Sequence, residues 1–150
     1  MPTIQRILHP TDFSEHSAAA ADYASLLTRQ FGAELHLLFV VEDAMGKIPE
    51  SGLGFPAPGD RVAVEPSALP RLEENVGVRS VDEARVFLAT RLGIINDQIV
   101  SYADEHSIDM IVIGTHGRRG LAHPLMGSVA EAVVRKANCP VLTVRDAKTA

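Results

Sequence analysis

Short apolar runs recur along the chain and predict five β-strands. The runs are rich in Val, Ile and Leu and are bounded by turn residues such as Pro10 and Gly114, which is typical of strands covered on both faces of a sheet. The expected strands are residues 4–9, 35–41, 84–92, 109–114 and 141–145. Pro10 ends the first of them because proline has no N–H to donate to a ladder.

Between these runs, apolar residues recur at helical spacing. Ser14 is a favourable N-cap for a first helix that ends at Gly32. Its apolar face holds Ala20, Tyr23, Ala24, Leu27 and Phe31. Asn96 is expected to cap a second helix, whose apolar face includes Ile99 and Ala103. A third is expected over residues 128–138, opened by a capping box of Ser128 and Glu131, with Ala130, Val133, Val134 and Ala137 facing inward.

Residues 84–92 are compatible with two structures. As a strand, they alternate Ala84, Val86, Leu88, Thr90 and Leu92 on one face; as a helix, they have a capping box of Ser80 and Glu83 and a stop at Gly93. Periodicity alone does not decide between them.

Residues 43–77 form an atypical segment rich in proline and glycine. It contains five of the nine prolines, at positions 49, 56, 58, 66 and 70. A continuous helix has room only late in it, over residues 67–75, with Pro70 near the first turn. We expect a mobile loop or lid here.

The alternation of strands and helices predicts an α/β protein with a three-layer sandwich around a parallel sheet. The strand, helix and strand of residues 4–41 indicate a parallel pair with a right-handed crossover. A chain of 150 residues without an internal repeat or a linker is expected to form one domain, residues 1–150.

Composition and charge exclude several classes of function. A net charge of −5 leaves no broad basic surface for nucleic acid. No run approaches the roughly 20 apolar residues that span a bilayer, and the N-terminus lacks the apolar core of a signal peptide. The single cysteine, Cys139, fits a reducing compartment. We therefore expect a cytoplasmic protein.

The segment IVIGTHGRRGLAHPLMGSV, residues 111–129, has the order expected of a phosphate-binding site. A buried strand ends at Gly114, a glycine-rich loop follows, and a helix opens at Ser128. Glycines allow a ligand to approach the backbone, and the free N–H groups and dipole of a helix N-terminus favour an anion. The loop and the turn after the first strand, residues 10–14, are expected to meet at the switch point of the sheet.

The spacing of Gly114, Gly117, Gly127 and Ser128 resembles the nucleotide-binding motif of the universal stress protein family. ILHPTDFSEHS (residues 7–17), GAELHLLFVVE (32–42) and CPVLTVR (139–145) are similar to the family's first, second and last strands with their turns. The resemblance implies a Rossmann-like, adenine nucleotide alpha hydrolase-like fold with a five-stranded parallel sheet in the order 3-2-1-4-5. It makes residues 84–92 the third strand, and it implies ATP as ligand, with Mg²⁺.

The resemblance also assigns residues to parts of the nucleotide. Pro10, Thr11 and Asp12 would line the adenosine end, and the backbone of Val40 would contact adenine. Ile113 and Gly114 would support the ribose. The phosphates would be held by Gly117, Gly127, Ser128 and Val129, with Arg118 near the terminal phosphate.

We therefore expect a nucleotide-binding regulator of the stress response that presents a regulatory protein partner with a nucleotide-dependent surface. A partner-binding protein without nucleotide and a slow ATPase or autophosphorylating protein are the alternatives. The sequence shows no nucleophile with its base, so turnover catalysis is not expected. Asp12 as a phosphoacceptor is disfavoured because no acidic pair precedes the first strand. The apolar last strand, Val141 to Arg145, is expected at a sheet edge, where it would pair two copies as a homodimer.

Overall fold

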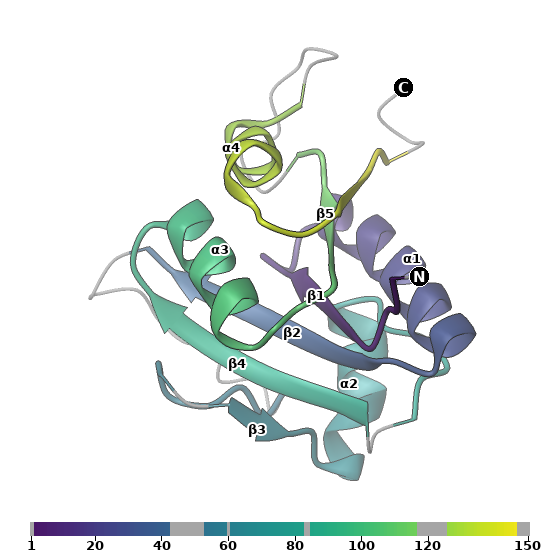
Figure 1. Cartoon of the computed structure of the whole chain (residues 1–150). Helices are drawn as coiled ribbons and strands as arrows, with labels where there is room; N and C mark the ends of the chain where they lie inside the picture. Colours follow the sequence, from purple (N-terminus) through teal and green to yellow (C-terminus); the bar gives the residue numbers. More distant parts are fainter. Residues whose placement is uncertain (1, 43–52, 60, 83–84, 117–125, 147–150) are drawn as a thin grey trace.

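Six strands form one mixed sheet in the order β3-β4-β2-β1-β5-β6 (Figure 1). The computed structural model describes residues 2–42, 53–59, 61–82, 85–116 and 126–146. The strands are β1 (Arg6–Pro10), β2 (Glu34–Val41), β3 (Arg61–Ala63), β4 (Val86–Leu92), β5 (Met110–Gly114) and β6 (Val141–Val144). The helices are α1 (Glu15–Phe31), η1 (Pro66–Ala68), α2 (Leu69–Asn75), α3 (Ile95–Glu105) and α4 (Ser128–Lys136).

The five predicted strands are all present, they are parallel, and their order is the expected 3-2-1-4-5. The ambiguous run at residues 84–92 is a strand, β4, that pairs with β2 over its full length. The five-strand count was wrong by one, because the short strand β3 adds to β4 in antiparallel orientation. β3 occupies residues 61–63 of the atypical segment, where no strand was expected.

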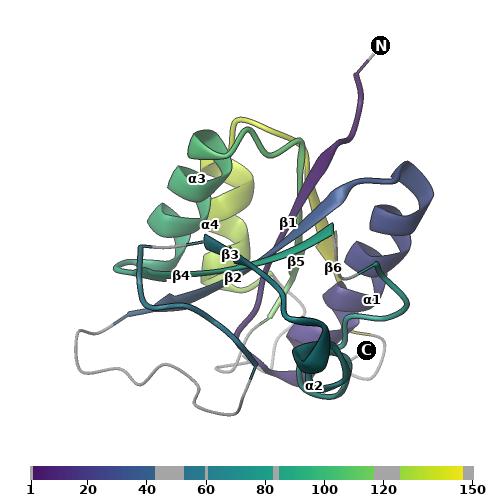
Figure 2. The same cartoon turned by 90° about the horizontal axis from the view of Figure 1, so that it is seen from below.

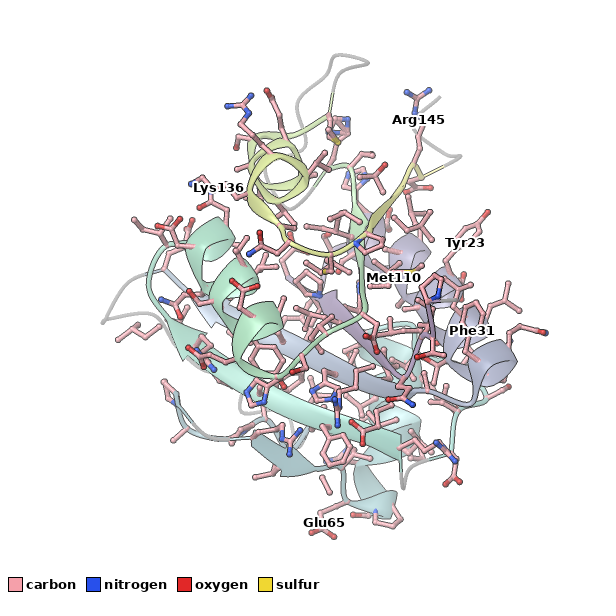
Figure 3. All side chains as sticks on the ribbon, viewed as in Figure 1. Tyr23, Phe31, Glu65, Met110, Lys136 and Arg145 are labelled. Atoms are coloured by element: carbon pink, nitrogen blue, oxygen red, sulfur yellow. The ribbon has the colours of Figure 1, made fainter. Side chains whose placement is uncertain are left out.

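The helices cover both faces of the sheet, as Figure 2 shows from below. Helices α1 and α2 pack on one face through a core that includes Ala20, Ala24 and Leu72. Helices α3 and α4 pack on the other face through Ile99 and Val133. Tyr23 and Phe31 were expected on the apolar face of α1, but they project outward (Figure 3), and each is about half exposed. Within the described ranges, none of the helices is long and apolar enough to cross a membrane.

The predicted limits of the first helix are confirmed at both ends. The Ser14 side chain accepts a hydrogen bond from the Ser17 N–H, and Gly32 adopts the left-handed conformation, with φ of 61°. The predicted cap of α3 is wrong, since its N-cap is Ile94 and Asn96 lies inside the first turn. Val134 was expected to face inward, but its side chain is 46% exposed.

The described part of the atypical segment contains regular secondary structure. Residues 43–52 and 60 lie outside the described residues, so the mobile loop or lid expected over residues 43–77 stays a prediction there. From Leu53 onward the chain is docked on the sheet: Leu53 is buried, the Gly59 N–H donates to the Thr90 carbonyl, and α2 occupies the place of the expected late helix. The three-residue η1 precedes α2. Pro66 begins η1 and Pro70 lies in the first turn of α2, and proline is tolerated at both positions.

Candidate functional site

The carboxyl edge of the sheet has a notch where β1 ends before its neighbours. The pairing of β1 with β2 stops at Pro10 and Leu38, whereas β2 and β4 stay paired to Val41 and Leu92. The backbone of Val40 therefore extends past the end of β1. This is the place predicted for adenine, at the edge where ligands of parallel sheets bind.

The turn after β1 is braced by its own side chains. The Thr11 N–H donates to the Leu38 carbonyl, and the Thr11 hydroxyl oxygen accepts from the Phe13 N–H and the Ser17 hydroxyl. An Asp12 carboxylate oxygen accepts from the Ser14 N–H at 2.9 Å. Thr11 is nearly buried and Asp12 is partly exposed, so Thr11 shapes the turn while Asp12 lies at its surface.

Phe13 holds this turn in an unusual conformation. Its φ of 64° lies in the left-handed region, which costs a non-glycine residue roughly 1–2 kcal/mol. Its ring packs 5.0 Å from the ring of Phe39 and 5.8 Å from that of Phe55, and the last two rings are 6.4 Å apart. These three rings, here called the aromatic bracket, join the turn to the end of β2 and to residues 53–59.

On its other side, β1 separates from β5. The two strands pair only at Ile7 with Met110 and Leu8 with Ile111, although β5 continues to Gly114. Beyond these pairs the His9 imidazole, fully buried, donates from Nδ1 to the Val112 carbonyl at 2.9 Å. Burial lowers the pKa of His9, against the raising effects of that hydrogen bond and of the Asp12 charge. His9 is therefore neutral at pH 7, with its proton on Nδ1.

Gly114 and Gly127 are required by close contacts of the backbone with itself. A Cβ at Gly114 would lie 2.8 Å from the carbonyl oxygen of His16, and one at Gly127 would lie 2.9 Å from that of Thr115. The Gly127 N–H also donates to the Thr115 carbonyl at 2.6 Å. These contacts bring the starts of α1 and α4 against the end of β5, at the edge predicted for the nucleotide.

Helix α4 begins differently from the prediction. Its N-cap is Gly127, with extended backbone, and Ser128 is the first helical residue, so the capping box of Ser128 and Glu131 was wrong. No side chain in the described residues caps this end. The Glu131 carboxylate instead pairs with Arg135 one turn later. The Ser128 side chain is exposed at this helix start, and the first N–H groups of a helix are the kind of group that favours an anion.

The apolar site residues turn their side chains into the core. Val40 and Ile113 are buried in the cluster that packs against α3 and α4, and Val129 packs on its border. Only their backbones remain for a ligand. This is the kind of contact that was predicted for Val40.

Two predicted phosphate contacts, Gly117 and Arg118, lie outside the described residues. The neighbouring His116 ring packs edge-on to the His16 ring at 6.0 Å, and His16 Nδ1 lies 3.7 Å from an Asp146 carboxylate oxygen. Two histidines and a carboxylate thus flank the end of β5. Sequence reasoning did not single out this group, because its members come from three separate segments.

Sequence reasoning also missed His9 and the aromatic bracket. The available signal for His9 was its place directly before a proline that ends a buried strand. No pattern linked Phe13, Phe39 and Phe55, which are separated in the chain and meet only in the fold.

The model of the universal stress protein family matches residues 3–145. A universal stress protein of Methanocaldococcus jannaschii is 34% identical over 150 residues, which cover 96% of this chain and 84% of that protein. The structure of the universal stress protein UspA from Lactobacillus plantarum superposes with a TM-score of 0.69 at 25% identity, covering 97% of this chain and all of that one.

Two further structures share the fold and were solved with nucleotides. One is a universal stress protein in complex with cAMP, with a TM-score of 0.65 at 24% identity, covering 95% of this chain and 98% of that one. The other is the universal stress protein from Archaeoglobus fulgidus in complex with dAMP, with a TM-score of 0.54 at 21% identity, covering 95% and 98%. The family model, the sequence relatives and the fold agree, and the chain belongs to the universal stress protein family.

Proposed function

We propose that this chain binds ATP, with Mg²⁺, at the carboxyl edge of its sheet and acts as a nucleotide-dependent regulator of the stress response in the cytoplasm. The observation that carries the proposal is the convergence of three segments at one edge. Gly114, at the end of β5, lies so close to the backbone of His16, at the start of α1, that a Cβ would not fit between them. Gly127, at the start of α4, lies equally close to the backbone of Thr115, directly after β5. The notch beside Val40 lies at the same edge.

The residues present fit each part of an adenine nucleotide. The Val40 backbone, past the end of β1, suits the edge of a base, and the Asp12 carboxylate suits ribose hydroxyls. The first turn of α4 suits phosphate oxygens, with Ser128 and Val129 offering N–H groups. Mg²⁺ would be held mainly by phosphate oxygens and water, since it keeps few protein ligands at such sites. The cAMP and dAMP complexes of fold neighbours support an adenine nucleotide.

The test is a calorimetric titration of ATP with Mg²⁺ into protein stripped of copurified nucleotide, repeated with Ser128→Asp. A carboxylate at the start of α4 suits the helix dipole, so the fold is retained, but it repels phosphate. We expect the wild type to bind and Ser128→Asp to bind at least about tenfold more weakly. Ser67→Asp, at an exposed position of η1, is the matched control and should bind as the wild type.

Absence of heat with wild-type protein would refute ATP binding and favour the second reading, a partner-binding stress protein without nucleotide. That reading draws on the described part of the atypical segment, from Leu53 onward, which packs on the same side of the sheet as Phe13. Release of ADP or transfer of label from ATP to the protein would identify the third, a slow ATPase or autophosphorylating protein.

We further propose that two copies pair through β6. This strand lies at the edge of the sheet, and its apolar side chains Val141 and Leu142 are only partly buried. Pairing across a two-fold axis would cover that edge. Light scattering at micromolar concentration should give twice the 16.1 kDa chain mass. Thr143→Pro, which removes a backbone donor from β6, should give the monomer mass, and a monomeric wild type would refute the dimer.

A further inference from the structure

Backbone groups of β1 alternate between its two neighbouring strands. The Glu34 N–H donates to the Gln5 carbonyl, and the Thr11 N–H donates to the Leu38 carbonyl, so odd-numbered residues bond to β2. The Asp109 N–H donates to the Arg6 carbonyl, so even-numbered residues face β5. In a parallel ladder this alternation continues along the strand. After Arg6 and Leu8, the next residue of β1 to face β5 is Pro10.

Pro10 has no N–H, so the ladder loses a donor at this position. The β1–β5 register stops one step earlier, at Leu8 and Ile111. The Ile111 N–H donates to the Pro140 carbonyl beside β6, so Val112 is the next β5 residue that faces β1, and its carbonyl is left without a ladder partner. A buried carbonyl without a partner is strongly disfavoured, and this one accepts its hydrogen bond from His9 Nδ1 instead.

We propose that His9 is a positioning residue for the nucleotide site: its imidazole replaces the N–H missing at Pro10 and holds the end of β1 apart from β5 at the switch point. The inference rests on the function proposed above. A backbone ladder would draw the two strands to the usual spacing of about 4.8 Å. A ring that reaches from β1 to a carbonyl of β5 keeps them separated where Thr11 and Asp12 turn toward the ligand.

The other nitrogen of His9 shows that the contact to Val112 is the one that matters. Nε2 is buried and has no hydrogen-bond partner in the described part of the chain. A residue that served only to fill space would be better chosen from the aliphatic side chains, which leave no polar atom unpaired. The histidine here supplies one N–H donor, at Nδ1, that is held by its side chain within hydrogen-bond distance of the Val112 carbonyl.

Three variants separate this role from simple packing. His9→Asn keeps an N–H donor close to the position of Nδ1, whereas His9→Leu removes it at similar bulk. His9→Leu with Pro10→Ala removes the ring but restores a backbone N–H that can close the ladder onto Val112. Tyr23→Ala, at an exposed site on α1, is the unrelated control.

The readouts are the unfolding midpoint without nucleotide and the affinity for ATP with Mg²⁺. We expect His9→Leu to lose several degrees in midpoint and about tenfold or more in affinity, the cost of an unmade buried hydrogen bond. We expect His9→Asn to stay within about threefold of the wild type in affinity. The double variant should regain the midpoint but not the affinity, because its strands close. Recovery of both in the double variant, or an unchanged affinity in His9→Leu, would overturn the proposal.

A measurement without nucleotide keeps this result separate from the function itself. The ¹⁵N shifts of the His9 ring at pH 7 should show a protonated Nδ1 and an unprotonated Nε2, and they should be unaffected by Tyr23→Ala. The opposite tautomer would overturn the role of His9 even if ATP binds. A wild type with the expected tautomer that does not bind ATP would refute the proposed function, and with it the link from His9 to affinity, while retaining the substitution for Pro10.

Discussion

Two fully buried histidines lie on neighbouring strands, and they differ in how many of their ring nitrogens are hydrogen-bonded. His9 on β1 has one nitrogen bonded and one without a partner in the described residues. His36 on β2 has both nitrogens bonded, with Nδ1 2.7 Å from the Tyr102 hydroxyl and Nε2 3.1 Å from a Glu34 carboxylate oxygen. The first lies at the predicted ligand edge, and the second lies on the face covered by α3.

The surroundings of His36 form a complete polar network. The Glu34 carboxylate also pairs with Arg6. The Tyr102 ring packs at a tilt against that of His106, with 4.2 Å between centroids, and the Arg91 guanidinium lies over the Tyr102 ring, 5.2 Å from its centroid. Burial raises the pKa of Tyr102 to about 12, so its hydroxyl stays protonated and donates to His36.

A fully hydrogen-bonded polar network and an incompletely bonded polar group are expected in different parts of a fold. A network in which every member is bonded rigidifies a core, and it needs no ligand to be complete. An incomplete one tends to lie where function sets the requirement. The His36 region is therefore expected to govern stability, and the His9 region is expected to govern binding.

The largest of the expected effects is a loss of unfolding free energy in acid, caused by protonation of His36. Burial lowers the pKa of His36 from 6.5 to about 4, more than the Glu34 hydrogen bond raises it. The folded protein thus binds fewer protons than the unfolded chain, and the stability from neutral His36 is complete above pH 6.5 and lost as the pH falls toward 4. The full loss is about 3 kcal/mol. Chemical unfolding measured between pH 7.5 and pH 4 should show it.

His36→Asn is the matched control, because its side-chain oxygen can still accept from Tyr102 but does not titrate. Its unfolding free energy should depend less on pH over the same window. The lowered pKa values of His9 and His106 act in the same direction, so some slope will remain. An equal slope in the two proteins would contradict the assignment to His36.

Gly114→Ala should damage the other region. The added Cβ would lie 2.8 Å from a backbone oxygen of His16, which cannot rotate away. We expect a loss of about 2 kcal/mol in unfolding free energy, and a loss of ATP affinity beyond what the unfolded fraction explains. Denaturant unfolding and calorimetry on the same preparation check both. Normal affinity in a folded Gly114→Ala protein would place the ligand elsewhere.

Phe55→Leu tests the aromatic bracket with a smaller effect. It removes two ring contacts, to Phe13 and Phe39, while keeping much of the volume. Each aromatic pair contributes about 0.5–1.5 kcal/mol, so we expect a loss of about 1.5 kcal/mol in thermal or denaturant unfolding. Phe31→Leu, at a half-exposed ring on α1, is the control and should stay within about 0.5 kcal/mol of the wild type.

The smallest difference is expected between two serines. Ser14 caps α1 through its side chain, whereas Ser128 is the first residue of α4 and caps nothing in the described structure. Ser14→Ala should cost about 1 kcal/mol of unfolding free energy, and Ser128→Ala should cost less than about 0.5 kcal/mol. Equal costs in denaturant unfolding would reinstate the capping box that the sequence suggested.

Much of the fold could be predicted because burial on both faces leaves a plain pattern. The continuous run at β2 and the helical spacing between Ala20 and Phe31 correspond closely to observed elements. β3 could not be predicted, since its three residues are all exposed and carry no periodic signal. β4 needed the family resemblance, because its periodicity also fitted a helix.

The candidate site was predictable in its segments and not in its details. The glycines at 114 and 127 were singled out for approach to a ligand, and the structure shows that the approaching atoms are backbone carbonyls of His16 and Thr115. Ser128 was taken for a cap because the sequence cannot show which residue first leaves helical geometry. The role of His9 depends on the register between β1 and β5, which is a property of two strands far apart in the chain.

The short strand β3 has a consequence for how the molecule could assemble. It covers the outer side of β4 with three exposed residues, one of them Arg61, and short charged edges resist further pairing. Within the described residues, β3 therefore blunts one edge of the sheet, and β6 forms the other edge. A sheet with only one edge available for pairing can join one other copy as a dimer, but it cannot extend into a fibre.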